Sequence, residues 1–363
     1  MTITRNPGDG PAETPTAPVE FGRSQCVLRI GRSSVRASWR AVLVVAALLL
    51  TAATVAVVAI GVGKYTVAPG DVLGVLLGTN TTFDRIVVLE WRMPRMLMAL
   101  LIGAALGLSG AIFQALTRNA LGSPDIIGIN SGAYTGALTV MAAIGGGYYA
   151  IAAGALAGGL LTAVVVYTLS YRNGLAGYRL IVVGIGVSAV LNSVNQWIVI
   201  KLELHLAVAA SVWQQGTLSG LGWAQVWPMS VCLAVGIATL VALGPQLPVL
   251  QMGDDAAGAL GVQPDRARIA YLVAGVGLVA VACAAAGPVS FVALAAPQLA
   301  RRLTASPGVG LVPSAVMGAV LLLVSDVIAQ QLFSGSELPV GAVTVSLGGL
   351  YLVYLLVTQA RQR

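Results

Sequence analysis

The feature that most constrains this chain is a series of apolar runs of about 20 residues, the length that crosses a lipid bilayer as a helix. Of the 363 residues, 57% are hydrophobic and 9% are charged, whereas soluble domains carry about 25% charged residues. We therefore predict an all-α polytopic membrane protein with about ten transmembrane helices. The predicted spans are residues 39–62, 93–116, 127–144, 149–170, 178–200, 224–244, 269–287, 291–301, 309–332 and 341–358. The eighth is too short to cross alone, and Gly287-Pro288 interrupts its approach, which is tolerated where protein or a water-filled cavity surrounds a broken helix.

The distribution of cations indicates how the spans are oriented. With ten spans and an inner N-terminus, the inner side holds Arg5, Arg23, Arg29, Arg32, Arg36, Arg40, Arg118, Arg172, Arg179, Arg266, Arg268, Arg301, Arg302, Arg361 and Arg363. The outer side holds Lys64, Arg85, Arg92, Arg95 and Lys201. Without the six cations of the N-terminal tail, the inner excess falls but remains, as the positive-inside rule requires. We expect both termini in the cytoplasm of a bacterial cell.

The first 36 residues differ from the rest. Residues 6–20 are rich in Pro, Gly and Thr, and residues 23–36 are basic. We predict a disordered cytoplasmic tail over residues 1–36, held at the anionic inner leaflet, followed by one membrane domain over residues 37–363. A signal peptide is disfavoured because the charged lead is long and the first apolar run is close to spanning length.

The sequence lacks the residues that several classes of function require. The net charge is +7, but no basic patch is interleaved with aromatics, so we expect no nucleic-acid binding. Cys26, Cys232 and Cys283 are scattered, and His205 is the single histidine, which predicts no disulfide framework and no multi-histidine metal site. The sequence has no P-loop and no H-E-x-x-H or G-x-S-x-G motif. We therefore expect no catalytic residues and no ATP site on this chain.

Few polar groups fall within the spans. Asp326 is the one well-buried carboxylate that the spans indicate, and it serves either a proton relay or hydrogen bonds to amides or hydroxyls of a neighbouring helix. Small residues at helical spacing in "GAALGLSGA" (103–111) and "GALAGG" (154–159) favour close helix packing over a ligand site.

A polar stripe marks the fifth span. Ser188, Asn192 and Asn195 are spaced by four and three residues and share one helix face. They either line a translocation pathway or hydrogen-bond across helices. Trp213 and Gln214 follow on the outer side, as an interfacial anchor or as a lip of the substrate entrance.

One soluble-looking segment, "GDDAAGALGV" (253–262), faces the cytoplasm between the sixth and seventh spans. Asp254 and Asp255 begin a short helix, where carboxylates favour its N-terminus. Leu260 supplies an apolar contact and Gly261 a stop. By itself the segment fits a docking helix or an ordinary capped surface helix.

Five stretches, in order and in register, resemble the FecCD family, the permease subunits of ABC importers for iron-siderophores, haem and vitamin B12. They are "WRMPRMLMALLIGAALGLSGAIFQALTRNALGSPDIIGINSGA" (91–133), "GDDAAGALGV", "GPVSFVALAAPQLARRL" (287–303), "LLLVSDVIAQ" (321–330) and "ELPVGAVTVSLGGLYLVYLL" (337–356). The resemblance covers residue 65 to the end.

The resemblance implies a type II ABC importer permease fold, paired with a second permease that is the same chain or a paralogue. It implies two P-loop ATPase subunits, which hold ATP and Mg²⁺, and an extracytoplasmic substrate-binding protein. The chain is then a transport subunit and not an enzyme, with a ferric siderophore as cargo and vitamin B12 or haem as alternatives. A secondary transporter or a passive pore is disfavoured, because neither needs a docking segment in the cytoplasm.

The resemblance also assigns roles to residues. It implies ATPase coupling by Asp254, Asp255, Leu260 and Gly261. It implies a cytoplasmic gate at Asn119, Leu121, Gly177 and Tyr178, with a tyrosine where a small residue is common. It implies docking of the binding protein by Arg92 and Arg95, which flank Pro94 in the first turn of the second span.

Three positions depart from the family pattern. Gln298 stands where the family has His, Gln330 where it has Arg, and Ala120 where many members have Pro. With Gln330 in place of an arginine, we expect Arg92 and Arg95 to carry more of the docking.

Overall fold

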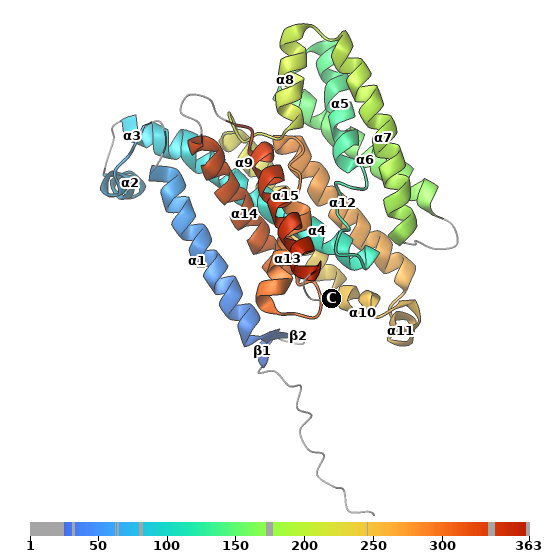
Figure 1. Ribbon diagram of the computed structural model, residues 1–363. Helices are drawn as coiled ribbons and strands as arrows, with labels where there is room; N and C mark the ends of the chain where they lie inside the picture. The colour runs from blue at the N-terminus through green and yellow to red at the C-terminus, as the bar shows by residue number, and fades with distance from the viewer. Residues whose placement is uncertain are drawn as a thin grey trace, which may run out of the picture.

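The computed structural model of the chain describes residues 25–30, 33–61, 63, 65–79, 83–171, 177–244, 246–332 and 338–360. Within these ranges the protein is a bundle of helices preceded by one two-stranded hairpin (Figure 1). The long helices are α1 (Trp39–Gly61), α4 (Met93–Thr117), α5 (Ile129–Ile144), α6 (Tyr148–Ser170), α7 (Gly177–Lys201), α9 (Trp223–Leu243), α12 (Pro264–Ala286), α13 (Val292–Thr304), α14 (Leu311–Gln331) and α15 (Val340–Ala360). The short elements are α2 (Pro69–Leu76), α3 (Phe83–Ile86), the π-helical turn η1 (Val87–Arg92), α8 (Leu204–Gln214), α10 (Gln246–Gln251) and α11 (Asp254–Ala259).

Each of the ten predicted spans coincides with one of the ten long helices, which confirms the all-α fold. Seven helical segments in the described part of the chain are long and apolar enough to cross a membrane alone. The others are α5, α13 and α15, of which α5 has 16 residues and α13 has 13. The count of ten is therefore approximate, because α5 and α13 are too short for a full crossing at 1.5 Å per residue.

The second span begins earlier than predicted. Helical backbone starts at Phe83 and runs through η1 into α4, making one segment of 35 residues, Phe83–Thr117. Pro94 has no N–H to donate, and a π-helical turn directly before it absorbs the missing bond. Pro94 therefore lies inside a continuous helix and does not begin it.

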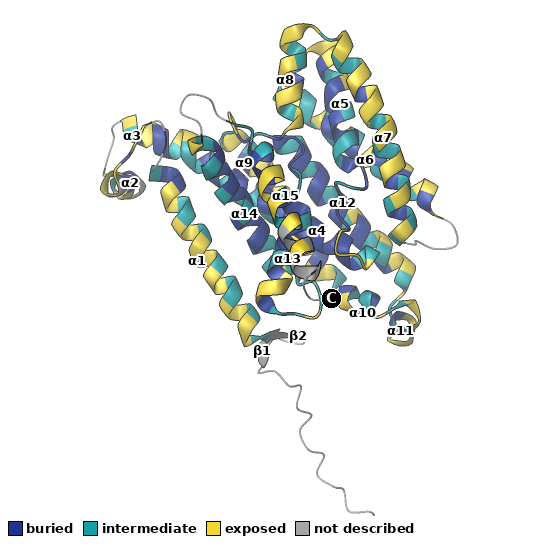
Figure 2. Ribbon diagram, viewed as in Figure 1, coloured by how far each residue is buried: buried dark blue, intermediate teal, exposed yellow. Residues whose placement is uncertain are grey.

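Helix α4 forms the centre of the core (Figure 2). Residues 102–115 are buried except for Ala104, and α4 packs against α12, α13 and α14. The approach is close because small residues face each other, and a Cβ on Gly110 would overlap the carbonyl oxygen of Ala293 in α13. This supports the packing interpretation of the 103–111 motif. Helices α5 and α6 meet in the same way, with Gly136 against Gly154.

The N-terminal part of the chain departs from the prediction. Strands β1 (Gln25–Ile30) and β2 (Ser33–Ser38) pair antiparallel, with Gln25 opposite Ser38. Residues 25–30 and 33–36 of the tail that we expect to be disordered thus lie in a hairpin, while the expectation for the rest of residues 1–36 stays a prediction. Residues 1–24 lie outside the described residues.

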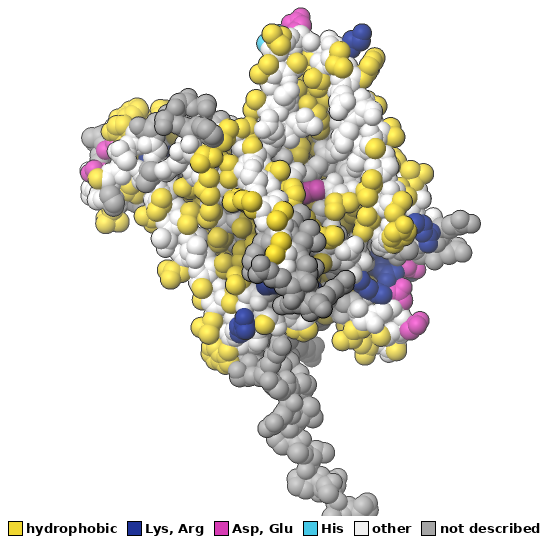
Figure 3. All heavy atoms as spheres, viewed as in Figure 1, with side chains coloured by type: hydrophobic (Ala, Val, Ile, Leu, Met, Phe, Trp, Pro, Cys, Tyr) yellow, Lys and Arg dark blue, Asp and Glu magenta, His cyan; other side chains and the backbone are white. Residues whose placement is uncertain are grey.

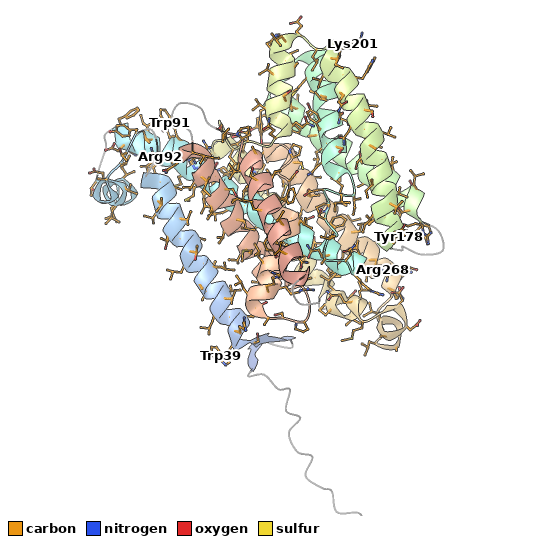
Figure 4. The ribbon with its side chains drawn as sticks, in the orientation of Figure 1. Trp39, Trp91, Arg92, Tyr178, Lys201 and Arg268 are labelled. Atoms are coloured by element: carbon orange, nitrogen blue, oxygen red, sulfur yellow. The ribbon has the colours of Figure 1, made fainter. Side chains whose placement is uncertain are left out.

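The two ends of the bundle carry different elements (Figure 4). Trp39, Tyr178 and Arg268 lie towards one end, and Trp91 and Lys201 towards the other. The short helices α10 and α11 lie at the end of Arg268 (Figure 1), which we call the coupling end. Apolar side chains are spread over the whole visible face, and charged groups gather mainly near the ends (Figure 3).

Candidate functional site

The predicted docking segment forms a helix with the expected ends. Helix α11 begins at Asp254, and its last turn closes through a bond from the Leu260 amide to the Ala256 carbonyl at 3.1 Å. Gly261 has φ +79°, the left-handed conformation that ends a helix most easily at glycine. Ala257 is fully buried and anchors the inner face of α11, whereas Leu260 is 63% exposed. The helix therefore presents a large apolar side chain outward, which suits a contact with another protein.

Asp254 does more than begin this helix. Its carboxylate accepts a hydrogen bond from Arg118 Nη2 at 3.0 Å and another from Arg268 Nη1 at 3.0 Å, and Arg268 Nη2 also pairs with it. The bonds from Arg268, with the charge of Arg118 added, lower the pKa of Asp254 although its partial burial opposes this. Asp255 remains exposed. Asp254 therefore ties α11 to the ends of α4 and α12.

The position of Arg118 depends on how α4 ends. Arg118 caps α4 in the left-handed conformation, with φ 49°. Its Nη2 also donates to the Leu250 carbonyl at 2.9 Å, so one side chain joins α4, α10 and α11. Neither Arg118 nor Arg268 was a predicted site residue. The only sequence signal was the presence of both cations on the same side as the two aspartates.

The predicted gate residues lie at the coupling end, Asn119 and Leu121 directly after α4 and Gly177 and Tyr178 at the start of α7. Asn119 accepts a hydrogen bond from the Leu121 amide at 2.9 Å. Gly177 is packed against the last turn of α4, since a Cβ there would lie 2.8 Å from Thr117 Cα. Leu121 and Tyr178 are 54% and 79% exposed. Within one chain these residues form an open rim, and a gate remains a prediction.

The polar stripe of α7 divides into two kinds of contact. Ser188 packs against Gly128, and Asn195 is buried and donates to the Ser131 carbonyl of α5 at 3.3 Å. Asn192 is exposed. These contacts support packing between helices for Ser188 and Asn195, and lining of a translocation pathway stays a prediction, with Asn192 as the exposed member of the stripe.

Trp213 is partly buried against a neighbouring helix, and its role as an interfacial anchor or as a lip of the entrance stays a prediction. Its ring stacks on Tyr134 of α5, with ring centroids 6.1 Å apart and an angle of 14° between planes. The chain just after it is held by a bond from the Thr217 amide to the Ala286 carbonyl at 2.8 Å. Gln214 is exposed beside this fixed segment, so a lip at an entrance remains a prediction for Gln214.

Arg92 and Arg95 are both hydrogen-bonded within the chain, and docking of a binding protein by these two arginines stays a prediction. Arg92 Nη1 donates to the Ile60 carbonyl at 2.6 Å, and Nη2 bonds the Tyr65 carbonyl. Arg95 forms a bidentate pair with Asp326 of α14, at 3.0 Å from Nη2 and 3.1 Å from Nε. A guanidinium near a membrane boundary that is already paired within its own chain is poorly placed to bind another protein.

The same ion pair differs from both roles expected for Asp326, a proton relay and hydrogen bonds to amides or hydroxyls of a neighbouring helix. Its carboxylate is 2% exposed and Arg95 is 15% exposed, and Gln330 Nε2 donates to Asp326 at 2.7 Å. Asp326 is thus a partner of a guanidinium and an amide side chain. A buried charge needs such partners, and Gln330 belongs to this cluster rather than to an outer docking surface.

A second, partly buried carboxylate was missed. Asp125, in the connection from α4 to α5, accepts from Asn130 Nδ2 at 2.7 Å and from the Phe291 amide at 3.3 Å. Phe291 begins α13 with φ 70°, so Asp125 joins the two irregular connections that precede the short helices α5 and α13. The sequence placed Asp125 in a loop, because nothing local shows that this connection folds back against α7.

Comparison with known proteins agrees with this arrangement. Residues 48–358 match the FecCD transport family. The chain is 45% identical over 325 residues to the ferric enterobactin transport system permease protein FepG of Escherichia coli, covering 89% of this chain and 98% of FepG. It is 34% identical to the iron(3+)-hydroxamate import system permease protein FhuG of Bacillus subtilis, covering 86% and 96%. It is 30% identical to the vitamin B12 import system permease protein BtuC of Salmonella schwarzengrund, covering 92% and 100%.

A solved structure shows the same architecture. A metal-chelate type ABC transporter in an inward-facing conformation superposes with a TM-score of 0.77 at 25% identity, covering 87% of this chain and 99% of that chain. The likeness therefore extends over the whole bundle.

Proposed function

Because the chain belongs to the FecCD transport family, we propose that it is the membrane-spanning permease subunit of an ABC importer that carries a ferric siderophore into the cytoplasm. Its relatives FepG and FhuG are named for ferric enterobactin and iron-hydroxamate transport. The relative named for vitamin B12 is less similar, at 30% identity. Vitamin B12 and haem remain the alternative cargoes.

The proposal depends mainly on one observation, the way in which α11 is attached to the rest of the bundle at the coupling end. Helix α11 exposes Leu260 to a partner and is tied through Asp254 to Arg118 at the end of α4 and to Arg268 in α12. Helix α4 is the centre of the core. A push on α11 therefore reaches the most buried helix of the bundle through one carboxylate, because packed helices move as units.

The assembly follows from this role. ATP and Mg²⁺ bind to two P-loop ATPase subunits that dock against α11 at the cytoplasmic face. A second permease, either the same chain or a paralogue, completes the pathway, and an extracytoplasmic binding protein delivers the cargo to the opposite face. Both termini lie on the cytoplasmic side, as the excess of cations there indicates. The gate of Asn119, Leu121, Gly177 and Tyr178 lies next to the coupling end of α4.

Uptake of labelled ferric siderophores by a bacterial strain lacking this chain tests the cargo, with labelled vitamin B12 as control. Restoration of siderophore uptake by the intact chain, without effect on vitamin B12 uptake, is the expected result. Restoration of vitamin B12 uptake alone would reassign the cargo.

Leu260→Asp tests the coupling. A charge placed in an apolar contact costs a few kcal/mol, so transport and transport-stimulated ATP hydrolysis should fall while membrane insertion is unchanged. Ala259→Ser, on the same exposed turn, serves as the matched control. Wild-type uptake by Leu260→Asp would show that α11 does not transmit the ATPase movement.

A further inference from the structure

A polar pocket of about 210 Å³ lies at the coupling end, beside α11 and separate from it. It opens between the last turn of α4, the end of α10, the last turns of α13 and the connection to α14. Its polar lining includes Gln114, Arg118, Gln251, Gln298 and Arg301. The lining shares Asn119 with the predicted gate and Arg118 with the Asp254 contact, but neither role assigns an occupant to the pocket.

The floor of the pocket is neutral and fixed. Gln114 and Gln298 are 3% and 9% exposed. Gln114 Nε2 donates to the Leu294 carbonyl at 2.9 Å, and Gln298 Nε2 donates to Gln114 Oε1 at 2.5 Å and to the Ala120 carbonyl at 3.2 Å. The chain itself occupies these amide donors, so Gln114 and Gln298 give the pocket its shape. Its charge comes from the residues around the opening, which we call the rim.

The rim is positive. Among the described residues the lining contains no carboxylate and two guanidinium groups, those of Arg118 and Arg301. Arg118 is partly neutralised by Asp254. For Arg301, no carboxylate of the described chain lies within 4.0 Å. Arg302, one residue further on, is also exposed but does not line the pocket, so the placement of Arg301 is specific.

We propose that this pocket is a socket for one Asp or Glu side chain of the ATPase subunit, held by Arg301 and Arg118. The proposal rests on the proposed function, because an ATPase docked on α11 lies against the same end of the bundle. Arg118 belongs both to the pocket rim and to the Asp254 contact, so a carboxylate in the socket and the coupling helix act on one guanidinium. A guanidinium binds a carboxylate through two parallel bonds, which fixes orientation as well as position.

The size of the pocket decides between kinds of occupant. Sites for small molecules typically measure about 300–1,000 Å³, whereas this pocket measures about 210 Å³. A single side chain fits that space and a nucleotide does not. Charge complementarity of this kind sets the register of a docking surface more than its affinity.

A cross-link provides the direct test. The sequence contains two lysines, Lys64 and Lys201, and both fall on the outer side in the predicted topology. Arg301→Lys therefore introduces a unique lysine at the coupling end while keeping the charge. A water-soluble carbodiimide joins a lysine amine to a carboxylate in direct contact, forming an amide while the carboxylate oxygen leaves in the urea by-product.

Applied to the assembled transporter in nanodiscs, this reagent should link Arg301→Lys to an Asp or Glu of the ATPase, located by mass spectrometry. Arg302→Lys is the matched control and should give no link above the wild-type background. Equal linking from both variants, or none from Arg301→Lys in an intact complex, would overturn the proposal.

A second measurement, of ATPase binding affinity, tests whether the positive charge of Arg301 contributes to docking. Arg301→Gln should weaken binding of the purified ATPase to permease nanodiscs by about fivefold at low salt, and this deficit should shrink as salt screens the pair. Arg302→Gln should leave the affinity unchanged. If Arg301→Gln instead alters only the binding of vesicles containing phosphatidylglycerol, the occupant is a lipid phosphate and the socket is rejected.

These outcomes are separable from a failure of the proposed function. An ATPase that binds the wild-type permease but is insensitive to Arg301 would refute the socket and leave the importer assignment intact. Absence of any binding to the wild-type permease would refute both.

Discussion

Helix α4 carries a charged cluster near each of its two ends, and the two clusters are built differently. Near its start, Arg95 pairs with Asp326, whose side chain is 2% exposed, in a segment surrounded by apolar helices. At its other end, Arg118 pairs with Asp254, and these side chains are 44% and 52% exposed. We call them the Arg95 cluster and the Asp254 cluster.

The difference indicates what each cluster can do. In a low-dielectric surrounding, a charge left without its partner is strongly unfavourable, so the Arg95 cluster holds α4 and α14 in one arrangement. In water, an ion pair contributes little to stability and can break and re-form. The Asp254 cluster is therefore suited to movement at the coupling end, and the Arg95 cluster to a fixed contact at the other.

The largest effect is expected from breaking the Arg95 cluster. Asp326→Ala leaves the guanidinium of Arg95 without its carboxylate and should lower the free energy of unfolding by about 3–5 kcal/mol. Thermal unfolding in detergent measures it. Gln330→Ala, which removes only the amide partner, should cost much less.

A double variant sharpens this result. Arg95→Met with Asp326→Leu removes both charges and should recover most of the stability, because a buried pair is often replaceable by apolar residues. Unchanged unfolding of Asp326→Ala would mean that the pair does not hold α4 to α14.

The next effect concerns the Asp254 cluster. Asp254→Ala should reduce uptake and stimulated ATP hydrolysis by about tenfold, in the range of ordinary coupling energies, while stability changes by less than about 1 kcal/mol. Asp255→Ala, on the adjacent exposed carboxylate, is the matched control and should transport normally. If both variants behave alike, the contact with Arg118 and Arg268 has no part in coupling.

A smaller effect is expected at the gate beside the Asp254 cluster. In a chain whose native cysteines are replaced by serine, Leu121→Cys and Tyr178→Cys should react with a thiol reagent at different rates in the nucleotide-free and ATP-bound transporter. The difference follows if α4 and the start of α7 move with α11. The same rates in every nucleotide state would leave these residues as an ordinary exposed rim.

The smallest effect is the response of the Asp254 cluster to pH. The bonds from Arg268 and the charge of Arg118 lower the pKa of Asp254 below the ordinary aspartate value of about 3.9. A lowered pKa contributes stability that is present above the ordinary value and is lost as pH falls through the pKa of the folded state. Coupling should therefore not change between pH 5 and 8 through this group. A carboxyl titration by NMR with a midpoint above 3.9 would contradict the pairing.

Local patterns predicted the features that depend on neighbouring residues in the chain. The start of α11 at Asp254 and its end at Gly261 follow from helix-capping rules. The ten helices follow from apolar runs, because each span must satisfy its own backbone in lipid. The close packing at Gly110 was likewise readable, since small residues at helical spacing permit little else.

Contacts between distant residues were not predictable in the same way. Arg95 and Asp326 are separated by 231 positions, and no periodicity relates them. Arg95 was therefore expected to face a partner, and Asp326 either to serve a proton relay or to bond amides or hydroxyls. Asp125 and Phe291 are 166 positions apart, and Asp125 was accordingly placed in a loop. The early start of the second span at Phe83 was missed because Pro94 is a helix-start signal, and only the π-helical turn before it removes that signal.

The sequence by itself determined a helical membrane protein of the FecCD family, the approximate bounds of its long helices, and the short helix that begins at Asp254, because all of these depend on composition and short spacing. The tertiary structure alone decided which charges meet, since a hydrogen bond requires donor and acceptor within about 3 Å and chain folding sets that distance. It paired Arg92 and Arg95 within the chain, joined Asp254 to Arg118 and Arg268, and placed Arg301 in the lining of a polar pocket.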